Sequence, residues 1–104
     1  MNDEQYLQYI YNSITENLNN LYKTIPIETE LNKEIKNSIN TLLANPPLIT
    51  NMANYLKNWS YIQSQSQNPN IALSVLPKQT IKLYTEQYIH WLNQTKHQSN
   101  VRIR

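Results

Sequence analysis

Not one of the 104 residues of this chain is glycine. Glycine is the residue that most readily takes a positive backbone φ and that lets a backbone approach a phosphate group closely. Glycine-rich phosphate loops, dinucleotide-binding fingerprints and nucleophile elbows depend on it, and so do the Asn-Gly and Asp-Gly turns that small β proteins favour. The sequence therefore excludes these motifs and favours a helical chain.

The chain also lacks cysteine, and its nine Lys and Arg residues only slightly outnumber its seven Asp and Glu residues. Without cysteine, disulfide frameworks, thiol nucleophiles and thiolate metal sites are excluded. A chain of this length supports one modest core, which leaves little room for a deep cofactor cavity. We expect one helical-bundle domain over residues 1–104 and no cofactor.

The amino terminus does not resemble a targeting segment. Residues 1–5 are acidic and polar, whereas a signal peptide begins with basic residues and continues with apolar ones. No apolar run in the sequence is long enough to cross a bilayer. These features predict a cytoplasmic protein, or one enclosed in a virion or nucleoprotein particle, that makes no membrane contact.

In residues 2–25, apolar side chains recur every three or four positions, which is the spacing of one helix face. We predict a first helix there, with Asn2 as its N-terminal cap, Gln5 completing a capping box, and Pro26 ending it. The next apolar series follows an acidic turn. It predicts a second helix whose buried face consists of Ile27, Leu31, Ile35, Ile39, Leu42 and Leu43.

Two prolines, Pro46 and Pro47, turn the chain into a third predicted helix. Its apolar side carries Leu48, Ile49, Met52, Tyr55, Leu56, Trp59 and Ile62. A fourth helix is predicted over residues 77–98, with a main apolar stripe of Ile81, Tyr84, Tyr88, Trp91 and Leu92.

Between these two helices, residues 63–70 form a polar stretch rich in Gln and Ser, which we predict to be a loop. The short apolar segment 71–76 fits either a helical turn or an extended chain, and residues 99–104 fit a basic tail. The predicted fold class is all-α. It is a small bundle of about four main helices, largely antiparallel, with a polar loop before the last helix.

Charge is distributed unevenly. Residues 1–34 carry six acids and two lysines, whereas residues 35–104 carry seven basic residues and a single acid, Glu86. A basic half can follow a phosphate backbone of DNA or RNA, with affinity that falls as salt rises. The candidate nucleic-acid contacts are Lys57, Lys78, Lys82, Lys96, Arg102 and Arg104. The alternatives are ordinary solvation and association of an acidic end with a basic end.

The aromatic residues of the chain are eight tyrosines and two tryptophans, and there is no phenylalanine. Most lie on or beside the apolar helix faces, so we expect core packing for Tyr11, Tyr22, Tyr55, Trp59, Tyr84, Tyr88 and Trp91. Tyr9 and Tyr61 project opposite the apolar faces of their helices. They are candidate exposed contacts for bases or for a protein partner, and an ordinary exposed tyrosine is the alternative.

Leu83 and Ile89 fall outside the main apolar stripe of the fourth helix, which makes them candidate protein-interface residues. Catalytic and metal-binding constellations are not apparent in the sequence. His90 and His97 are two helical turns apart, about 10.5 Å, which is too far for one metal ion to hold both. No serine, histidine and carboxylate are spaced for acyl transfer. We expect no catalytic residues, no metal and no small-molecule substrate.

These features lead to two hypotheses about function. The favoured one is a non-catalytic small helical subunit of a larger nucleoprotein assembly. Such a subunit would contact nucleic-acid backbone through its basic C-terminal half, without sequence specificity, and would bind other protein subunits. The alternative is a protein-interaction or self-assembling structural module with no nucleic-acid role.

Overall fold

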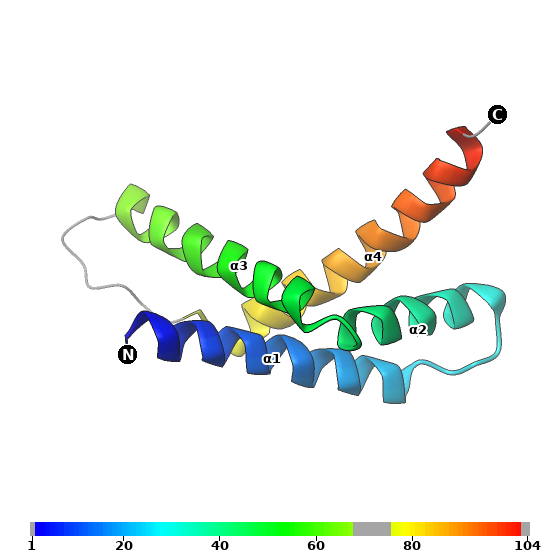
Figure 1. Ribbon diagram of the computed structural model, residues 1–104, viewed down its shortest axis with the longest axis horizontal. Helices are drawn as coiled ribbons and strands as arrows, with labels where there is room; N and C mark the ends of the chain where they lie inside the picture. Colours follow the sequence, from blue (N-terminus) through cyan, green and yellow to red (C-terminus); the bar gives the residue numbers. More distant parts are fainter. Residues whose placement is uncertain (1, 68–75, 103–104) are drawn as a thin grey trace.

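The computed structural model describes residues 2–67 and 76–102, and these form four α-helices (Figure 1). The helices are α1 (Asp3–Thr24), α2 (Glu30–Leu43), α3 (Pro46–Gln67) and α4 (Lys78–Arg102). Figure 1 shows α1 and α2 as an antiparallel pair, with α3 and α4 rising from it in different directions. The predicted all-α class with four main helices is confirmed.

The start and end of α1 match the prediction. The Asn2 side chain accepts a hydrogen bond from the Gln5 backbone N–H at 2.8 Å, and the Gln5 side chain accepts one from the Asn2 backbone N–H at 3.3 Å. This is the capping box, which satisfies two donors that a helix start leaves without partners. At the other end, Ile25 is extended, as expected for the residue before Pro26.

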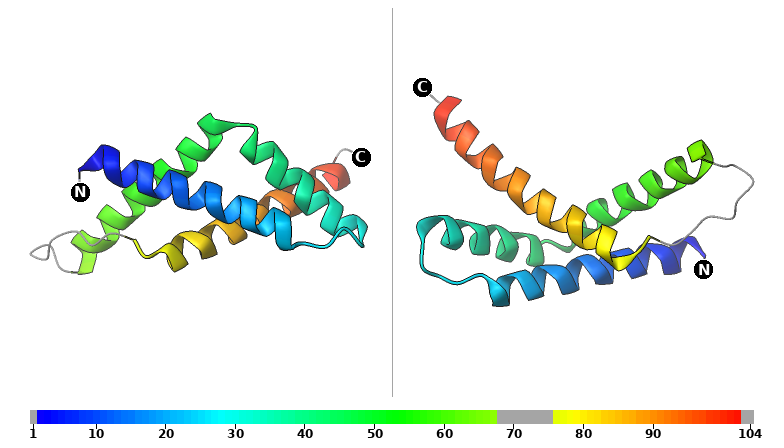
Figure 2. Two further views of the ribbon diagram at one scale, coloured as in Figure 1. Left: turned by 90° about the horizontal axis from the view of Figure 1, so that it is seen from below. Right: turned by 180° about the vertical axis from the view of Figure 1, so that it is seen from behind.

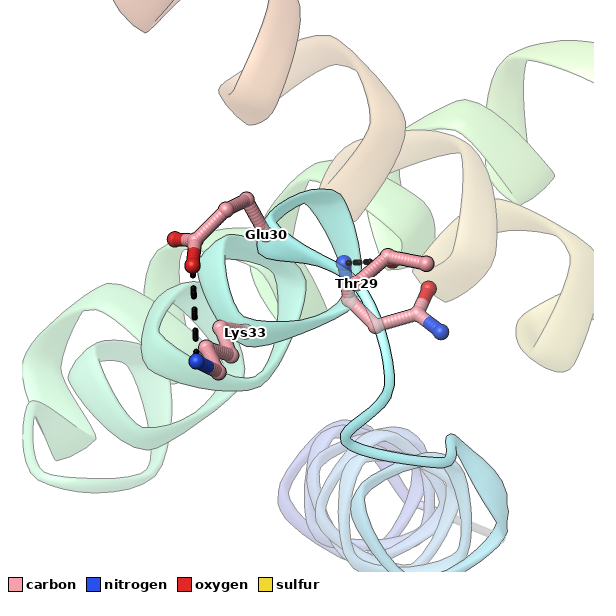
Figure 3. A network of polar contacts seen from close by, with 4 residues as sticks. Thr29, Glu30 and Lys33 are labelled. Atoms are coloured by element: carbon pink, nitrogen blue, oxygen red, sulfur yellow. Dashed lines mark hydrogen bonds and ion pairs between the residues drawn. The ribbon is translucent and has the colours of Figure 1, made fainter.

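α2 begins later than the apolar series suggested. The Thr29 side chain caps it by accepting from the Asn32 backbone N–H at 3.1 Å, and Glu30 pairs with Lys33 at 3.4 Å in the first turn (Figure 3). Ile27 therefore precedes the helix and is exposed. Leu31 is also exposed, because α4 has risen away from α2 at this end (Figure 1). Neither residue belongs to the buried face predicted for them.

α3 and α4 both run further than predicted. α3 continues to Gln67, so the first part of the predicted 63–70 loop is helical. The sequence explains the extension, because Gln and Ser are compatible with a helix and the next helix-breaking residue is Pro69. α4 continues to Arg102, so the predicted tail is helical to that point. Residues 68–75 and 103–104, including most of segment 71–76, lie outside the described residues.

The core is built on α1, which contacts α2, α3 and α4. Isoleucine and leucine side chains from α1 and α2 fill its centre with no exposed surface, and they are joined by residues of the other two helices. The buried hydrophobic side chains are Tyr6, Ile10, Ile14, Leu18, Ile39, Leu42, Ile49, Met52, Ala53, Leu56, Leu76, Ile81 and Ile89. Among the described residues, no helix combines the length and the apolar composition needed to span a bilayer.

α3 and α4 touch each other near Tyr55 and Tyr84 and then diverge, as all three ribbon views show (Figures 1 and 2). The molecule is accordingly flat and open, with extents of 50 × 32 × 21 Å and a radius of gyration of 15.8 Å. A compact chain of about 100 residues has a radius of gyration near 13 Å. The open shape leaves part of each diverging helix uncovered.

The buried face of α3 is rotated from the predicted one. Ile49, Met52 and Leu56 are buried against the core as expected, but Tyr55 and Ile62 are 59% and 63% exposed and Trp59 is also exposed. The reason is that α1 covers one side of α3, while α4 leaves the adjoining side open by diverging from it. Core packing was therefore a wrong expectation for Tyr55 and Trp59.

The buried face of α4 is also rotated. Ile81, Thr85, Ile89 and Asn93 are buried, whereas Trp91 is 55% exposed. Two of these buried residues are polar, and both make hydrogen bonds. The Thr85 hydroxyl donates to the Ile81 carbonyl at 2.8 Å, and the Ser38 hydroxyl of α2 donates to Asn93 Oδ1 at 3.2 Å. Core packing was thus a wrong expectation for Trp91.

Candidate interaction surface

An exposed aromatic surface spans α3 and α4 where they diverge. Tyr55 of α3 stacks on Tyr84 of α4 with ring centroids 5.7 Å apart, and the contacts continue to Tyr88 at 6.2 Å and from Tyr88 to Trp91 at 5.6 Å. Trp59 and Ile62 follow Tyr55 at intervals of four and three residues, so they lie on the same side of α3 and continue the surface along it. We call this surface the aromatic face, and it consists of Tyr55, Trp59, Ile62, Tyr84, Tyr88 and Trp91.

Helical spacing accounts for the way these side chains line up. Positions 55, 59 and 62 on α3 and positions 84, 88 and 91 on α4 share the same interval of four and then three residues, which places each set on one side of its helix. Each set lies next to the buried face of its own helix. Since Tyr55 touches Tyr84, the two sets face each other across the divergence.

The centre of the aromatic face is partly shielded from water. Tyr84 and Tyr88 are half-buried, while Tyr55 and Trp91 on either side are exposed. Burial, with smaller contributions from the neighbouring Tyr88 and Tyr55, raises the pKa of Tyr84 to about 12. A desolvated phenol favours its neutral form, because the phenolate loses hydration there.

This shift predicts that the protein loses stability above pH 10. The folded protein holds Tyr84 neutral up to about pH 12, whereas the unfolded chain ionises this tyrosine near its ordinary pKa of 10. The contribution of neutral Tyr84 to the free energy of unfolding is therefore complete below pH 10 and disappears between pH 10 and 12. Urea unfolding at pH 9 and pH 11.5 should show this loss, and it should be smaller in Tyr84→Phe. Absorbance titration at 295 nm should show late tyrosinate formation, and its amplitude should be smaller by one tyrosine in Tyr84→Phe. An unchanged late step in that variant contradicts the assignment.

The lysines of α3 and α4 lie away from the aromatic face. Lys57 is two residues from both Tyr55 and Trp59, which puts it about 160° from each around the helix. Lys82 stands in the same relation to Tyr84. Lys78 and Lys82 line a shallow hollow between α1 and α4, together with the carboxylates of Glu16 and Glu86.

The six predicted nucleic-acid contacts therefore do not form one basic surface within the described side chains, 2–63 and 76–94. Lys57 lies on α3, and Lys78 and Lys82 lie among acids at the α1 side of α4. Lys96 and Arg102 belong to α4, but their side chains are outside the described ones, and Arg104 is outside the described residues altogether.

Tyr9 and Tyr61 are not the free contacts that the sequence suggested. Both are half-buried, and both rings lie beside Tyr6, with centroids 6.4 and 6.2 Å away. The Tyr9 hydroxyl donates to the Leu76 carbonyl at 2.8 Å, and the Tyr61 hydroxyl donates to the Asp3 carboxylate. Burial raises the pKa of Tyr9, and the hydrogen bond to Asp3 raises the pKa of Tyr61. Leu76 and Tyr61 therefore cover the side of α1 that was expected to face solvent.

Tyr6, which the sequence reasoning missed, completes this arrangement. The Leu76 backbone N–H donates to the Tyr6 hydroxyl at 3.1 Å, that hydroxyl donates to Ser60 Oγ at 3.0 Å, and the Ser60 hydroxyl donates to the Lys57 carbonyl at 2.9 Å. Tyr6 and Tyr9 thus hold both backbone polar groups of Leu76, and we call this pair the tyrosine clamp. The available signal was that Tyr6 continues the four-residue stripe of Ile10 and Ile14.

The two predicted interface residues of α4 have different environments. Leu83 is 52% exposed and lies outside the aromatic face, about 100° around α4 from Tyr84 and on the same side as Gln87 and Gln94. Ile89 is only 5% exposed and belongs to the core. The prediction of Ile89 as an interface residue is wrong, because α4 packs on α1 and α2 through the stripe that contains it.

The polar residues considered for a metal or catalytic site do not form a cluster among the described side chains. Glu86 and His90 border a shallow hollow that is otherwise lined by Leu21, Ile25, Ile35, Ile39 and Ile89. Among the described side chains, those of residues 2–63 and 76–94, no three His, Asp or Glu are grouped as ligands for a metal ion. The aromatic face, by contrast, brings together exposed side chains of α3 and α4 that are all large and mostly aromatic. Comparison of the chain with protein-family models, with curated proteins and with solved structures finds no match.

Proposed function

We propose that this protein is a non-catalytic interaction module that binds a protein partner through the aromatic face. The observation that carries the proposal is the exposure of Tyr55, Trp59, Ile62 and Trp91 on two helices that diverge from a common contact. Tyrosine and tryptophan are enriched at the centres of protein interfaces, where they bury a large area at small entropic cost. An apolar patch of this kind on a small protein typically marks a binding site.

The surroundings of the aromatic face support a protein partner over a nucleic acid. The exposed side chains next to it are the amides Asn51, Asn58, Gln87 and Gln94. A single-stranded nucleic acid that stacks its bases on aromatic rings also needs cations beside them for its phosphates. Lys57 and Lys82 lie on the opposite sides of their helices. Nucleic-acid contact stays a prediction that binding measurements can test.

A displayed library of amphipathic helices, selected on immobilised protein, tests the proposal. We expect wild-type protein to enrich helices with aromatic and aliphatic faces, because these can bury the exposed rings. The double variant Tyr55→Glu/Trp91→Glu should not retain them, and Gln79→Glu, which places a charge on the exposed side of α4 about 140° from Tyr84, should. Circular dichroism verifies that all three remain helical. Equal retention by the double variant would overturn the proposal.

Fluorescence anisotropy with labelled DNA and RNA single strands and duplexes tests the alternative on the same proteins. Binding that weakens steeply with salt, disappears in Lys78→Glu/Lys82→Glu and survives in the aromatic double variant would replace the proposal with the nucleoprotein hypothesis. We expect Lys78 and Lys82 to contribute little to such binding, because they lie beside Glu16 and Glu86.

A further inference from the structure

We infer that the partner is a second copy of this chain, with the two aromatic faces joined about a two-fold axis. The inference rests on the proposed function, because it names the occupant of the same surface. In a symmetric dimer of this kind, one surface patch must be complementary to itself. Three properties of the aromatic face meet that condition.

The first property is its shape. The α3 and α4 sides carry side chains at the same interval and diverge from the contact between Tyr55 and Tyr84 (Figures 1 and 2). One helix of a second copy can therefore lie between α3 and α4 of the first, and the reverse holds by symmetry. This arrangement covers the exposed rings, and it explains why a single chain has a radius of gyration of 15.8 Å when about 13 Å is normal for its length.

The second property is the uncharged rim that α3 and α4 give the aromatic face at Asn51, Asn58, Gln87 and Gln94. Amides flank it on both helices, and an amide offers both donors and acceptors, so it can pair with its own counterpart in another copy. A symmetric contact between charged rims would instead place equal charges against each other. The low net charge of +2 adds little long-range repulsion between copies.

The third property is area. From the exposed fractions of Tyr55, Trp59, Ile62 and Trp91, these residues expose on the order of 500 Å² in each copy. At complete coverage two copies bury on the order of 1,000 Å² from them, which is the lower limit for a specific interface before the amide rim is added. We therefore expect a reversible dimer.

Both tryptophans of the chain, Trp59 and Trp91, belong to the aromatic face, so intrinsic fluorescence reports directly on its burial. As protein concentration rises from about 1 to several hundred micromolar, the mass from light scattering should rise from one chain to two. The tryptophan emission maximum should shift to shorter wavelength over the same range. Tyr55→Asp/Trp91→Asp should stay monomeric, and the control Gln79→Asp, at an exposed position about 140° around α4 from Tyr84, should dimerise like wild type.

The possible outcomes separate the inference from the proposed function. A wild-type protein that stays monomeric overturns the inference, and helix-library selection then decides whether the aromatic face binds another protein or none. A dimer that survives in the double variant, or that Gln79→Asp abolishes, overturns it as well. A dimer that dissociates in 1 M salt would indicate pairing of acidic and basic ends, since salt screens charges but does not weaken apolar contacts.

Discussion

Ile89→Asp is expected to unfold the protein at 25 °C and to abolish most of its helical circular dichroism signal. Ile89 is 5% exposed and belongs to the core formed by all four helices. The substitution removes buried aliphatic contacts and places an ionisable group where it has no partner, which together cost on the order of 5 kcal/mol. A small domain has a total unfolding free energy of about 5–15 kcal/mol, and this open one is expected to lie at the lower end.

Leu83→Asp is the matched control, six residues earlier on the same helix. The Leu83 side chain is already 52% exposed, so an aspartate there remains hydrated and should change the unfolding free energy by less than about 0.5 kcal/mol. Urea unfolding followed at 222 nm compares the two variants. A folded Ile89→Asp protein with altered mass in solution would instead make Ile89 an interface residue and would contradict the position of α4.

Tyr6→Phe is expected to lower the unfolding free energy by about 2 kcal/mol, although it removes a single oxygen atom. That oxygen accepts from the Leu76 backbone N–H and donates to Ser60, inside a region that excludes water. Without it the Leu76 N–H is buried and unpaired, and an unsatisfied buried donor costs about 1–3 kcal/mol. Chemical denaturation at neutral pH measures the change.

Tyr88→Phe is the control for the loss of a tyrosine hydroxyl. The Tyr88 ring contacts Tyr84 and Trp91, and phenylalanine preserves the ring. Its unfolding free energy should stay within about 0.5 kcal/mol of wild type. If Tyr6→Phe proves as stable as Tyr88→Phe, the hydrogen-bond chain from Leu76 to Ser60 does not contribute to stability.

The features that were predictable from sequence are those that neighbouring residues determine. The capping box of Asn2 and Gln5 and the end of α1 before Pro26 involve residues within one helical turn of each other, and their geometry is the same in any helix. The apolar period likewise predicted four helices, because an amphipathic helix must bury one of its sides.

The covered sides of α3 and α4 were not predictable, because coverage depends on where the two helices cross. The apolar sector of α4 includes both Ile89 and Trp91, and periodicity alone cannot say which part of so broad a sector faces the core. The structure buries Ile89 and exposes Trp91 because α4 diverges from α3 after Tyr84. The contact of Tyr6 with Leu76 joins residues 70 positions apart, and no local pattern encodes it.

The tyrosine clamp ties the amino-terminal turns of α1 to the residue from which α4 starts. Leu76 lies two residues before α4, and α4 extends for 25 residues, or about 37 Å, from there. The clamp fixes where the helix begins, and the packing of Ile81, Thr85 and Ile89 on α1 and α2 fixes its direction. Over that length, a change of about 10° in direction displaces the carboxyl-terminal end of α4 by about 6 Å. The surface that a partner meets between α3 and α4 therefore depends on α1 at both levels, through two hydroxyl groups and through the buried stripe.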